Sequence, residues 1–219
     1  MWISCAAEGR AGGGPVDITG PEVQEIIPAS LEFLLQDRVT IRFDENVNPV
    51  SVPASVIIDP EIPCLILTRG KSIQIVPEGN WPSNEVIHIQ LNRTIRDYQG
   101  NSMSEATELF YTTGTPIPAG KISGQLFNIS HNTIYQLGLF DISHGDPGEM
   151  VRRTDSAEDG TFQFNHIADG EYIVAGVEGK LTDFGIDHRH KNYGIQTNPP
   201  IRVYSGNEVR DISLYFDLP

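Results

Sequence analysis

The stretch NEVIHIQLN (residues 84–92) alternates apolar and polar side chains along most of its length. Ile87, Ile89 and Leu91 fall on one side, whereas His88 and Gln90 fall on the other. A period of two is typical of a strand that buries one of its two faces. The stretch therefore predicts a strand of a β-sheet with its apolar side chains in a core.

Similar strand signals recur about every ten residues around this stretch. RVTIRFDENV (38–47) alternates in the same way, and SVIID, CLILT and SIQIVP (55–59, 64–68 and 72–77) each end near Pro or Gly. IRDYQGN (95–101) predicts a turn, because Asp, Gly and Asn favour the backbone angles that turns require. ELFYTTG (108–114) predicts a closing strand. With no sustained helical period, this half is predicted to be a β-sandwich of about seven strands.

The segment TGTPIPAG (113–120) is rich in Gly and Pro and separates the two halves of the chain. Strand signals resume after it, in GKISGQLFN (120–128), IYQLGLFDI (134–142), DGTFQFNHIADGEYIVAGVEG (159–179) and EVRDISLYFDL (208–218), whereas 180–200 is less regular. We therefore predict an all-β protein of two consecutive β-sandwich domains. The expected boundaries are 1–20 for a flexible tether, 21–116 for the first domain and 119–219 for the second.

The first half resembles a known family through PEVQEIIPAS (21–30), VTIRFDENVNPVSV (39–52) and IRDYQGNSMSEATELFYTTG (95–114). The strand that runs into FDENV and the later turn IRDYQGN are similar to the bacterial Ig-like domain often named after the S-layer protein SbsA. The resemblance implies an Ig-like module of envelope and surface proteins, with no catalytic residues to carry over.

The second half resembles the carboxypeptidase regulatory-like and collagen-adhesin B-type family. The likeness rests on GKISGQLFN and on RTDSAEDGTFQFNHIADGEYIVAGVEG (153–179), which is about one residue longer before Gly160 than the family pattern. This family has a prealbumin-like sandwich, so the resemblance implies a fold rather than an activity.

The residues ISCA (3–6) are similar to a lipoprotein signal, because the small Ser4 precedes Cys5 and a Gly-rich stretch follows. Trp2 stands where Leu is usual, and the charged and apolar parts of a signal peptide are absent. We expect Cys5 to be lipidated, the alternative being a terminus without a role. Several acyl chains, at ~0.8 kcal/mol per buried CH2, would anchor the protein durably.

The complete arrangement resembles envelope lipoproteins of Bacteroidetes-like bacteria. It implies a protein of the cell envelope, tied to the outer membrane through a lipid and facing either the periplasm or the exterior. The formal net charge of -14 argues against nucleic acid as a partner, since the phosphates would be repelled. The second cysteine, Cys64, lies in an apolar run and is expected to be a small buried side chain.

His188 and His190, beside Asp187, form the one cluster with the look of a metal site, since side chains two apart on a strand face the same side. A solvated polar loop is the favoured alternative, and no cofactor is expected. Calcium ligands are conceivable at four acidic positions, although their spacing fits no known calcium loop. These positions are Asp141, Asp146, Asp155 and Asp159.

The sequence carries no recognisable catalytic motif. A nucleophile elbow, a zinc-protease HExxH pair and a phosphate-binding Gly-rich loop are all missing. The prealbumin-like hydroxyisourate hydrolase ends in Tyr-Arg-Gly-Ser, whereas this chain ends SLYFDLP. We therefore expect a protein that is not an enzyme.

Trp81, in the loop GNWPSN (79–84), is the best candidate for stacking on a sugar, although a Trp in such a loop also serves to cap a sandwich core. The leading hypothesis is a non-enzymatic, lipid-anchored envelope protein acting as a structural or interaction module, with an envelope protein or a glycan as its unknown partner. The alternatives are a glycan- or peptidoglycan-binding module and an accessory subunit of an envelope enzyme complex.

Overall fold

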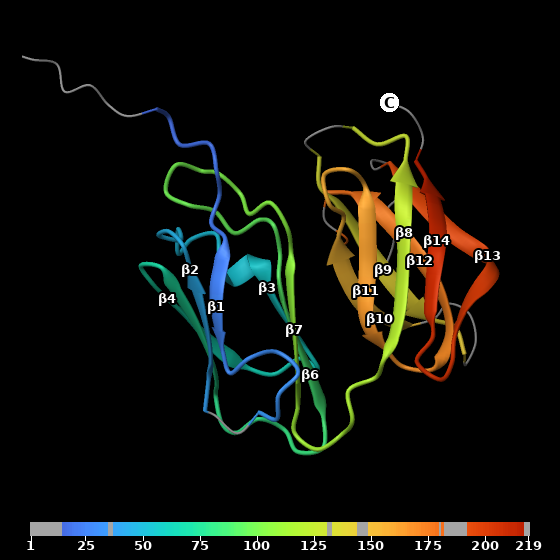
Figure 1. The fold of residues 1–219 in the computed structure, drawn as a ribbon, viewed down its shortest axis with the longest axis horizontal. Coiled ribbons are helices and arrows are strands. Elements are labelled where there is room, and N and C mark those ends of the chain that lie inside the picture. The colour runs from blue at the N-terminus through green and yellow to red at the C-terminus, as the bar shows by residue number, and fades with distance from the viewer. Residues whose placement is uncertain are drawn as a thin grey trace, which may run out of the picture.

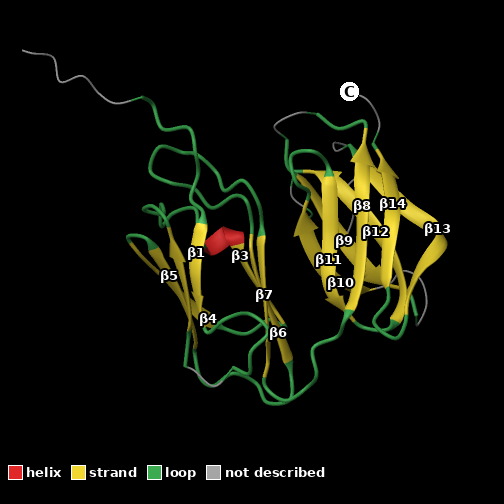
Figure 2. Cartoon of the chain, viewed as in Figure 1, coloured by secondary structure: helices red, strands yellow, loops and turns green. Residues whose placement is uncertain are grey.

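The computed structural model describes residues 15–34, 37–130, 133–143, 149–179, 181 and 192–216. Within these residues it contains fourteen strands, β1 to β14, and a single short 3-10 turn, η1 (Pro53–Ser55). The strands form two sandwiches that follow one another along the chain, as Figures 1 and 2 show. The predicted fold class, an all-β protein of two sandwiches, is confirmed. None of the described residues belongs to a helix with the length and hydropathy needed to span a membrane.

The first sandwich is built from antiparallel strand pairs in two sheets. One sheet has the order β1-β2-β5-β4 and the other has the order β3-β6-β7. The strands are β1 (Val23–Ile27), β2 (Val39–Phe43), β3 (Val56–Asp59), β4 (Cys64–Arg69), β5 (Ser72–Pro77), β6 (Val86–Leu91) and β7 (Thr107–Thr112).

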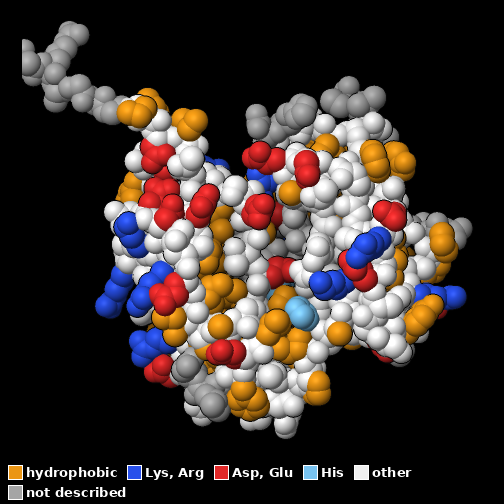
Figure 3. Space-filling model, viewed as in Figure 1, with side chains coloured by type: hydrophobic (Ala, Val, Ile, Leu, Met, Phe, Trp, Pro, Cys, Tyr) orange, Lys and Arg blue, Asp and Glu red, His pale blue; other side chains and the backbone are white. Residues whose placement is uncertain are grey.

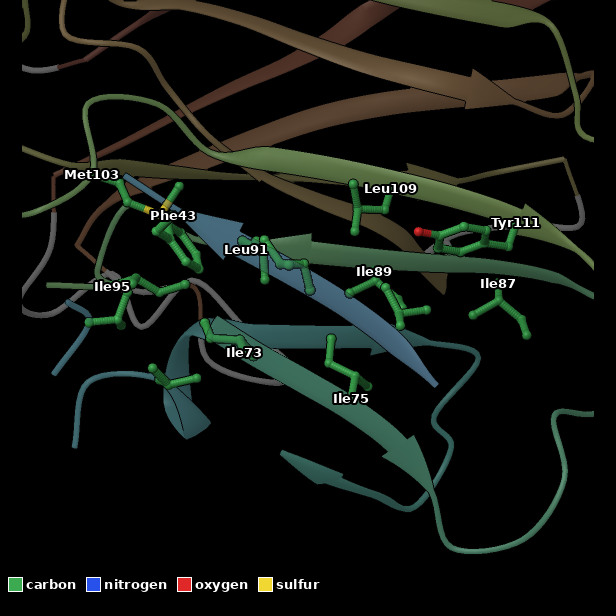
Figure 4. Packing of buried hydrophobic residues seen from close by; sticks show 14 of the residues in the cluster. Phe43, Ile73, Ile75, Ile87, Ile89, Leu91, Ile95, Met103, Leu109 and Tyr111 are labelled. Atoms are coloured by element: carbon green, nitrogen blue, oxygen red, sulfur yellow. The ribbon is translucent and has the colours of Figure 1, made fainter. Parts of the chain in front are cut away.

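The core of the first sandwich follows from the alternation seen in the sequence. Ile87, Ile89 and Leu91 of β6 have no exposed surface, and they face apolar side chains of the opposite sheet such as Ile73 and Ile75 (Figure 4). Burying each of these side chains contributes about 1.5–3 kcal/mol relative to leaving it in water. The predicted inward face of residues 84–92 is therefore correct.

The turn predicted at IRDYQGN is held by a buried carboxylate. Asp97 accepts hydrogen bonds from the backbone N–H groups of Gly100 (2.6 Å) and Asn101 (2.7 Å) and from the Asn101 side-chain amide (2.8 Å). Gly100 has a φ of 96°, a value that glycine reaches without steric cost. The motif is thus a structural turn, which explains its Asp, Gly and Asn in physical terms.

The second sandwich contains the remaining seven strands. One sheet has the order β10-β9-β12-β13 and the other has the order β11-β8-β14, in which β14 runs parallel to β8. The strands are β8 (Gly120–Phe127), β9 (Tyr135–Asp141), β10 (Glu149–Asp155), β11 (Thr161–Ile167), β12 (Gly170–Glu178), β13 (Tyr193–Val203) and β14 (Glu208–Tyr215). Aromatic side chains, including Tyr135, Phe164 and Phe216, fill its core.

One segment of the second sandwich is more regular than the sequence indicates. Residues 193–200 were expected to be irregular, yet they form the first part of β13. Pro199 and Pro200 lie in this strand, where a proline removes a donor from the ladder. β13 is the edge strand of its sheet, so it needs partners on one side only, and prolines are tolerated there.

Candidate functional site

The polar face of β6 is not exposed to solvent. His88 is 2% exposed and Gln90 is completely buried, although both point away from the core of the first sandwich. On β7, Phe110 also points outward and is 2% exposed, and it belongs to neither hydrophobic core. The second sandwich covers these side chains, with β10 and β11 facing β6 and β7 in Figure 1. The outer face of one sandwich is thus an interface.

An aromatic ring lies at the centre of this interface. Phe110 stacks on His88 of its own sheet at 4.4 Å between ring centres, and it meets His166 of β11 at 4.5 Å with the rings inclined by 59°. The Arg152 guanidinium of β10 lies 5.9 Å from the Phe110 ring centre, within the range of a cation–π contact. Phe110 therefore contacts two strands of the second sandwich.

Charged side chains surround the aromatic centre. Arg93, which follows β6, donates to the Ser156 carbonyl oxygen (3.1 Å) and to Glu158 Oε1 (3.2 Å). Its backbone N–H also donates to Asp155 Oδ2 at 3.3 Å. Asn165 donates to Glu108 Oε2 at 3.0 Å, again between the two sandwiches. Hydrogen bonds to charged groups contribute more than neutral ones, so this ring of contacts stabilises one relative placement of the sandwiches.

The linker between the sandwiches is also held in place. The His166 ring lies 2.8 Å from the Pro118 carbonyl oxygen through its Nδ1 atom. Arg152, besides contacting Phe110, forms an ion pair with Asp59 at the end of β3. The contacts between the halves therefore run from the linker to the far edge of the β3-β6-β7 sheet.

Asp155 is the buried acid of the interface. It is 7% exposed, and burial raises the pKa of its carboxyl above the usual Asp value, although hydrogen bonds from Gln136 and Arg93 act in the opposite direction. Gln136 donates to Asp155 Oδ1 at 3.1 Å. The interface thus contains a carboxyl that ionises less readily in the folded protein than an ordinary Asp does.

A groove of about 720 Å³ opens beside the interface. Its floor is the outer face of the β11-β8-β14 sheet, and one wall is formed by residues 105–108 of the first sandwich together with Arg93. Figure 3 looks onto this face, where the surface over β11 is mostly neither hydrophobic nor charged, whereas acidic and basic side chains lie over the lower part of β8 and β14. Both sandwiches contribute to the groove, so its shape depends on the interface.

Part of the signal for this site is visible in the sequence. The alternation of residues 84–92 correctly assigns His88 and Gln90 to the face away from the core. An outward Phe110 between the inward Leu109 and Tyr111 is the further signal, since a large apolar side chain on the outer face of a sheet is normally covered. Sequence alone does not identify what covers it.

The predicted site residues fall into two groups. Cys5, Asp187, His188 and His190 lie outside the described residues, so their roles stay predictions. Trp81 is partly buried and packs against the core of the first sandwich, the second of its two predicted roles. Cys64 also packs against this core but is only partly buried, whereas a buried side chain was predicted, and burial raises the pKa of its thiol.

The proposed calcium ligands do not come together among the described residues. Asp155 lies in the interface, and Asp159 holds a turn by accepting from the Thr161 backbone N–H at 2.9 Å. Asp146 is outside the described part of the chain. The three carboxylates that do converge are Asp17, Glu45 and Asp97, whose oxygen atoms lie within 4.8 Å of one another.

This convergence has an electrostatic consequence in the first sandwich. Burial and the neighbouring charges of Asp97 and Asp17 raise the pKa of Glu45. Burial also opposes ionisation of Asp97, but hydrogen bonds from Asn101 and Gly100 outweigh it and lower its pKa. The turn that Asp97 anchors supplies hydrogen bonds to its carboxylate, and these bonds allow the charged group to be buried.

Residues 17–113 match the family model described as the bacterial Ig-like domain, and this range contains β1 to β7. The first sandwich is therefore similar to the bacterial Ig-like domain, a class that is typical of extracellular and envelope proteins. The whole sequence matches no curated protein.

Solved structures give only distant matches over most of the chain. An L,D-transpeptidase from Mycobacterium smegmatis is 12% identical, with 90% of each chain covered and a TM-score of 0.33. The N-terminal part of the bacterial S-layer protein SbsC is 15% identical over 88% of this chain and 44% of that one, with a TM-score of 0.29. BcpA, the major pilin subunit of Bacillus cereus, is 11% identical over 91% and 71%, with a TM-score of 0.27. Values this low carry no activity over to this chain.

Proposed function

We propose that this chain is a non-enzymatic, lipid-anchored protein of the bacterial envelope that acts as a structural and interaction module. The observation that carries the proposal is the burial of Phe110 between the two sandwiches. Domains joined by a linker alone move independently, whereas an interface with a buried aromatic centre and charged contacts favours one arrangement. Such a unit suits a spacer that holds a partner at a fixed distance from a membrane.

The anchor is proposed to be Cys5, with residues 1–20 as the tether and the outer membrane as the location. The Ser4–Cys5 pair and the Gly-rich stretch after it support this proposal, as does the envelope distribution of bacterial Ig-like domains. A tether of this length would allow the first sandwich to orient its surface away from the lipid.

The second sandwich is proposed to belong to the carboxypeptidase regulatory-like, prealbumin-like family. The motif GKISG lies in β8. Both of its glycines lie where the backbone of a neighbouring segment approaches too closely for a larger side chain. A Cβ on Gly120 would lie 2.4 Å from the Ile167 carbonyl oxygen, and one on Gly124 would lie 2.0 Å from that of Ile212. These glycines support a structural role for the motif.

The anchor is tested by changing each cysteine in turn in the producing bacterium. Cys5→Ala is expected to release the protein from the membrane fraction and to abolish incorporation of labelled palmitate. Cys64→Ala is the matched control, because Cys64 packs against the core, and it should stay with the membrane. If the Cys5 variant remains in the membrane fraction, or the parent protein takes up no label, the lipid anchor is wrong.

A further inference from the structure

The floor of the groove between the sandwiches has an unusual composition. Arg210 and Asp211 of β14 also line the groove, but six of its outward side chains, from three adjacent strands, carry a carboxamide or a hydroxyl group without charge. They are Ser123, Gln125, Thr161, Gln163, Asn165 and Ser213. In the register of the sheet, Gln125 is flanked by Thr161 on β11 and by Ser213 on β14. The result is a flat array of neutral donors and acceptors.

Two aromatic rings lie at one end of this array. Phe127 of β8 and Tyr215 of β14 are partners in the register, and their rings stack at 5.0 Å with an angle of 18°. Phe127 is 39% exposed and Tyr215 is 65% exposed, so part of each ring faces solvent. Phe127 also lines the groove. The aromatic pair therefore extends the polar floor with a platform for stacking.

The charges around the groove argue against an anionic ligand. Arg93 is engaged by Ser156 and Glu158, and Arg210 forms an ion pair with Glu208 at 2.6 Å. Four acidic side chains line the same groove, against these two arginines. They are Glu105, Glu108, Asp155 and Asp211. Negative charge in excess, with both guanidinium groups already paired, favours an uncharged ligand.

We propose that the groove binds an uncharged glycan chain. The hydroxyl groups of pyranose rings would exchange hydrogen bonds with the carboxamides and hydroxyls of the floor, and a C–H face of one ring would stack on the aromatic pair. The face of an aromatic ring is negative and attracts C–H groups that carry partial positive charge. The volume of about 720 Å³ is within the range of about 300–1,000 Å³ typical of small-ligand sites, so it accommodates a short saccharide segment.

A protein partner fits this surface less well. The cores of protein interfaces are depleted in charge and enriched in aromatic and apolar side chains, whereas the centre of this floor is polar. The proposed glycan site also differs from the sequence-based candidate Trp81, which packs against the core of the other sandwich. The inference goes beyond the structural role proposed above, and it does not depend on lipidation of Cys5.

The test uses the purified full chain on an array of neutral oligosaccharides, with sulfated and uronic-acid glycans as charged counterparts. We expect binding to at least one neutral glycan, confirmed by calorimetry. Tyr215→Ala should weaken that binding about tenfold, the order expected for the loss of one stacking contact. Phe127→Leu, which keeps apolar volume but removes the ring, should weaken it in the same direction. Thermal unfolding of each variant checks that the fold survives.

The matched control is Tyr204→Ala, because Tyr204 belongs to the same sandwich and is 60% exposed but is not the register partner of Phe127, as Tyr215 is. It should leave glycan affinity within twofold of the parent. The proposal is overturned if no neutral glycan binds, if charged glycans bind as tightly as neutral ones, or if the control weakens binding as much as Tyr215→Ala. Preferential binding to a polypeptide probe with a silent array would assign the groove to a protein partner instead.

Discussion

The guanidinium of Arg152, on the second sandwich, lies 5.9 Å from the centre of the Phe110 ring, on the first, and also pairs with Asp59. One cation thereby contacts two strands of the β3-β6-β7 sheet, β3 through a carboxylate and β7 through a ring. His88 and His166 contact the same ring. Phe110 is therefore a side chain on which contacts from both sandwiches converge.

Replacing Phe110 with Ala is expected to separate the two sandwiches. The loss of a buried aromatic ring should lower the free energy of unfolding by about 3 kcal/mol. The maximum dimension from small-angle X-ray scattering should increase, and denaturation should split into two transitions. Phe33→Ala is the matched control, because Phe33 is 51% exposed and its removal should change neither measurement. Unchanged scattering from the Phe110 variant would show that the charged contacts suffice.

The buried carboxyl of Asp155 predicts a pH-dependent stability. Burial raises its pKa in the folded protein above the value near 3.8 expected in the unfolded chain. The protonated form is thus favoured by folding, and its contribution is complete below about pH 3.8 and lost as the pH rises through the folded pKa. Asp155→Asn, which cannot ionise, should remove this loss.

The measurement is chemical denaturation of both proteins from about pH 3 to about pH 7. Stability of the parent relative to Asp155→Asn is expected to decrease as the pH rises. A difference that stays constant over this range, or changes in the opposite direction, contradicts the raised pKa. Asp169→Asn provides a control in the same sandwich, at an exposed carboxylate.

The interface also shows where prediction from sequence succeeds and where it ends. A period of two is a local property, so it correctly places Ile87 and Ile89 in the core and His88 on the opposite face. What covers Phe110 on the same outer face depends on residues such as His166, far along the chain, and no local pattern encodes that contact. The turn at Asp97 was also predictable from local sequence, because Asp, Gly and Asn favour the backbone angles of turns.

Edge strands and composite surfaces were less predictable. The prolines of β13 suggest an irregular segment unless the strand is known to lie at an edge, which is a property of the sheet. The groove floor combines three strands, and β14 reaches β8 from the far end of the sequence. Gln125 and Ser213 therefore become neighbours only in the folded sheet, and neither is conspicuous in its own segment.

Asp97 is expected to stabilise the first sandwich in its ionised form. Its pKa is lowered, so its contribution is present above about pH 3.8 and is lost as the pH falls through the folded pKa. Asp97→Ala leaves the N–H groups of Gly100 and Asn101 without their acceptor and should cost about 1–3 kcal/mol at neutral pH. Denaturation of this variant and of the parent at about pH 7 and about pH 2.5 should show the difference shrinking in acid. A difference that persists in acid contradicts the role of the charge.

Trp81→Ala is expected to act on stability. Because Trp81 packs against the core of the first sandwich, its removal should lower the free energy of unfolding by about 2 kcal/mol. Tyr98→Ala is the control on the same sandwich, since Tyr98 is 66% exposed and should be close to neutral. Glycan affinity, measured on the folded fraction, should not change with either variant. A selective loss of glycan binding with unchanged stability would restore Trp81 as a ligand residue.

Gly124 is expected to tolerate no side chain, because β8 and β14 approach one another closely at this position. A Cβ there would lie 2.0 Å from the Ile212 carbonyl oxygen and 2.6 Å from the Phe162 ring. The Ile212 oxygen belongs to the backbone of β14, so relief requires the two strands to move apart. Gly124→Ala should therefore lower the free energy of unfolding by about 3 kcal/mol, the upper part of the range for overpacking.

Gly79→Ala is the matched control for this change, because a Cβ at Gly79 meets nothing within 4 Å. It should be neutral or slightly stabilising, since alanine restricts the unfolded chain more than glycine does. Urea denaturation of both variants separates the clash from the general effect of a glycine replacement. Equal stabilities would mean that β14 shifts freely along β8, and the flat floor of the groove would then have no fixed register.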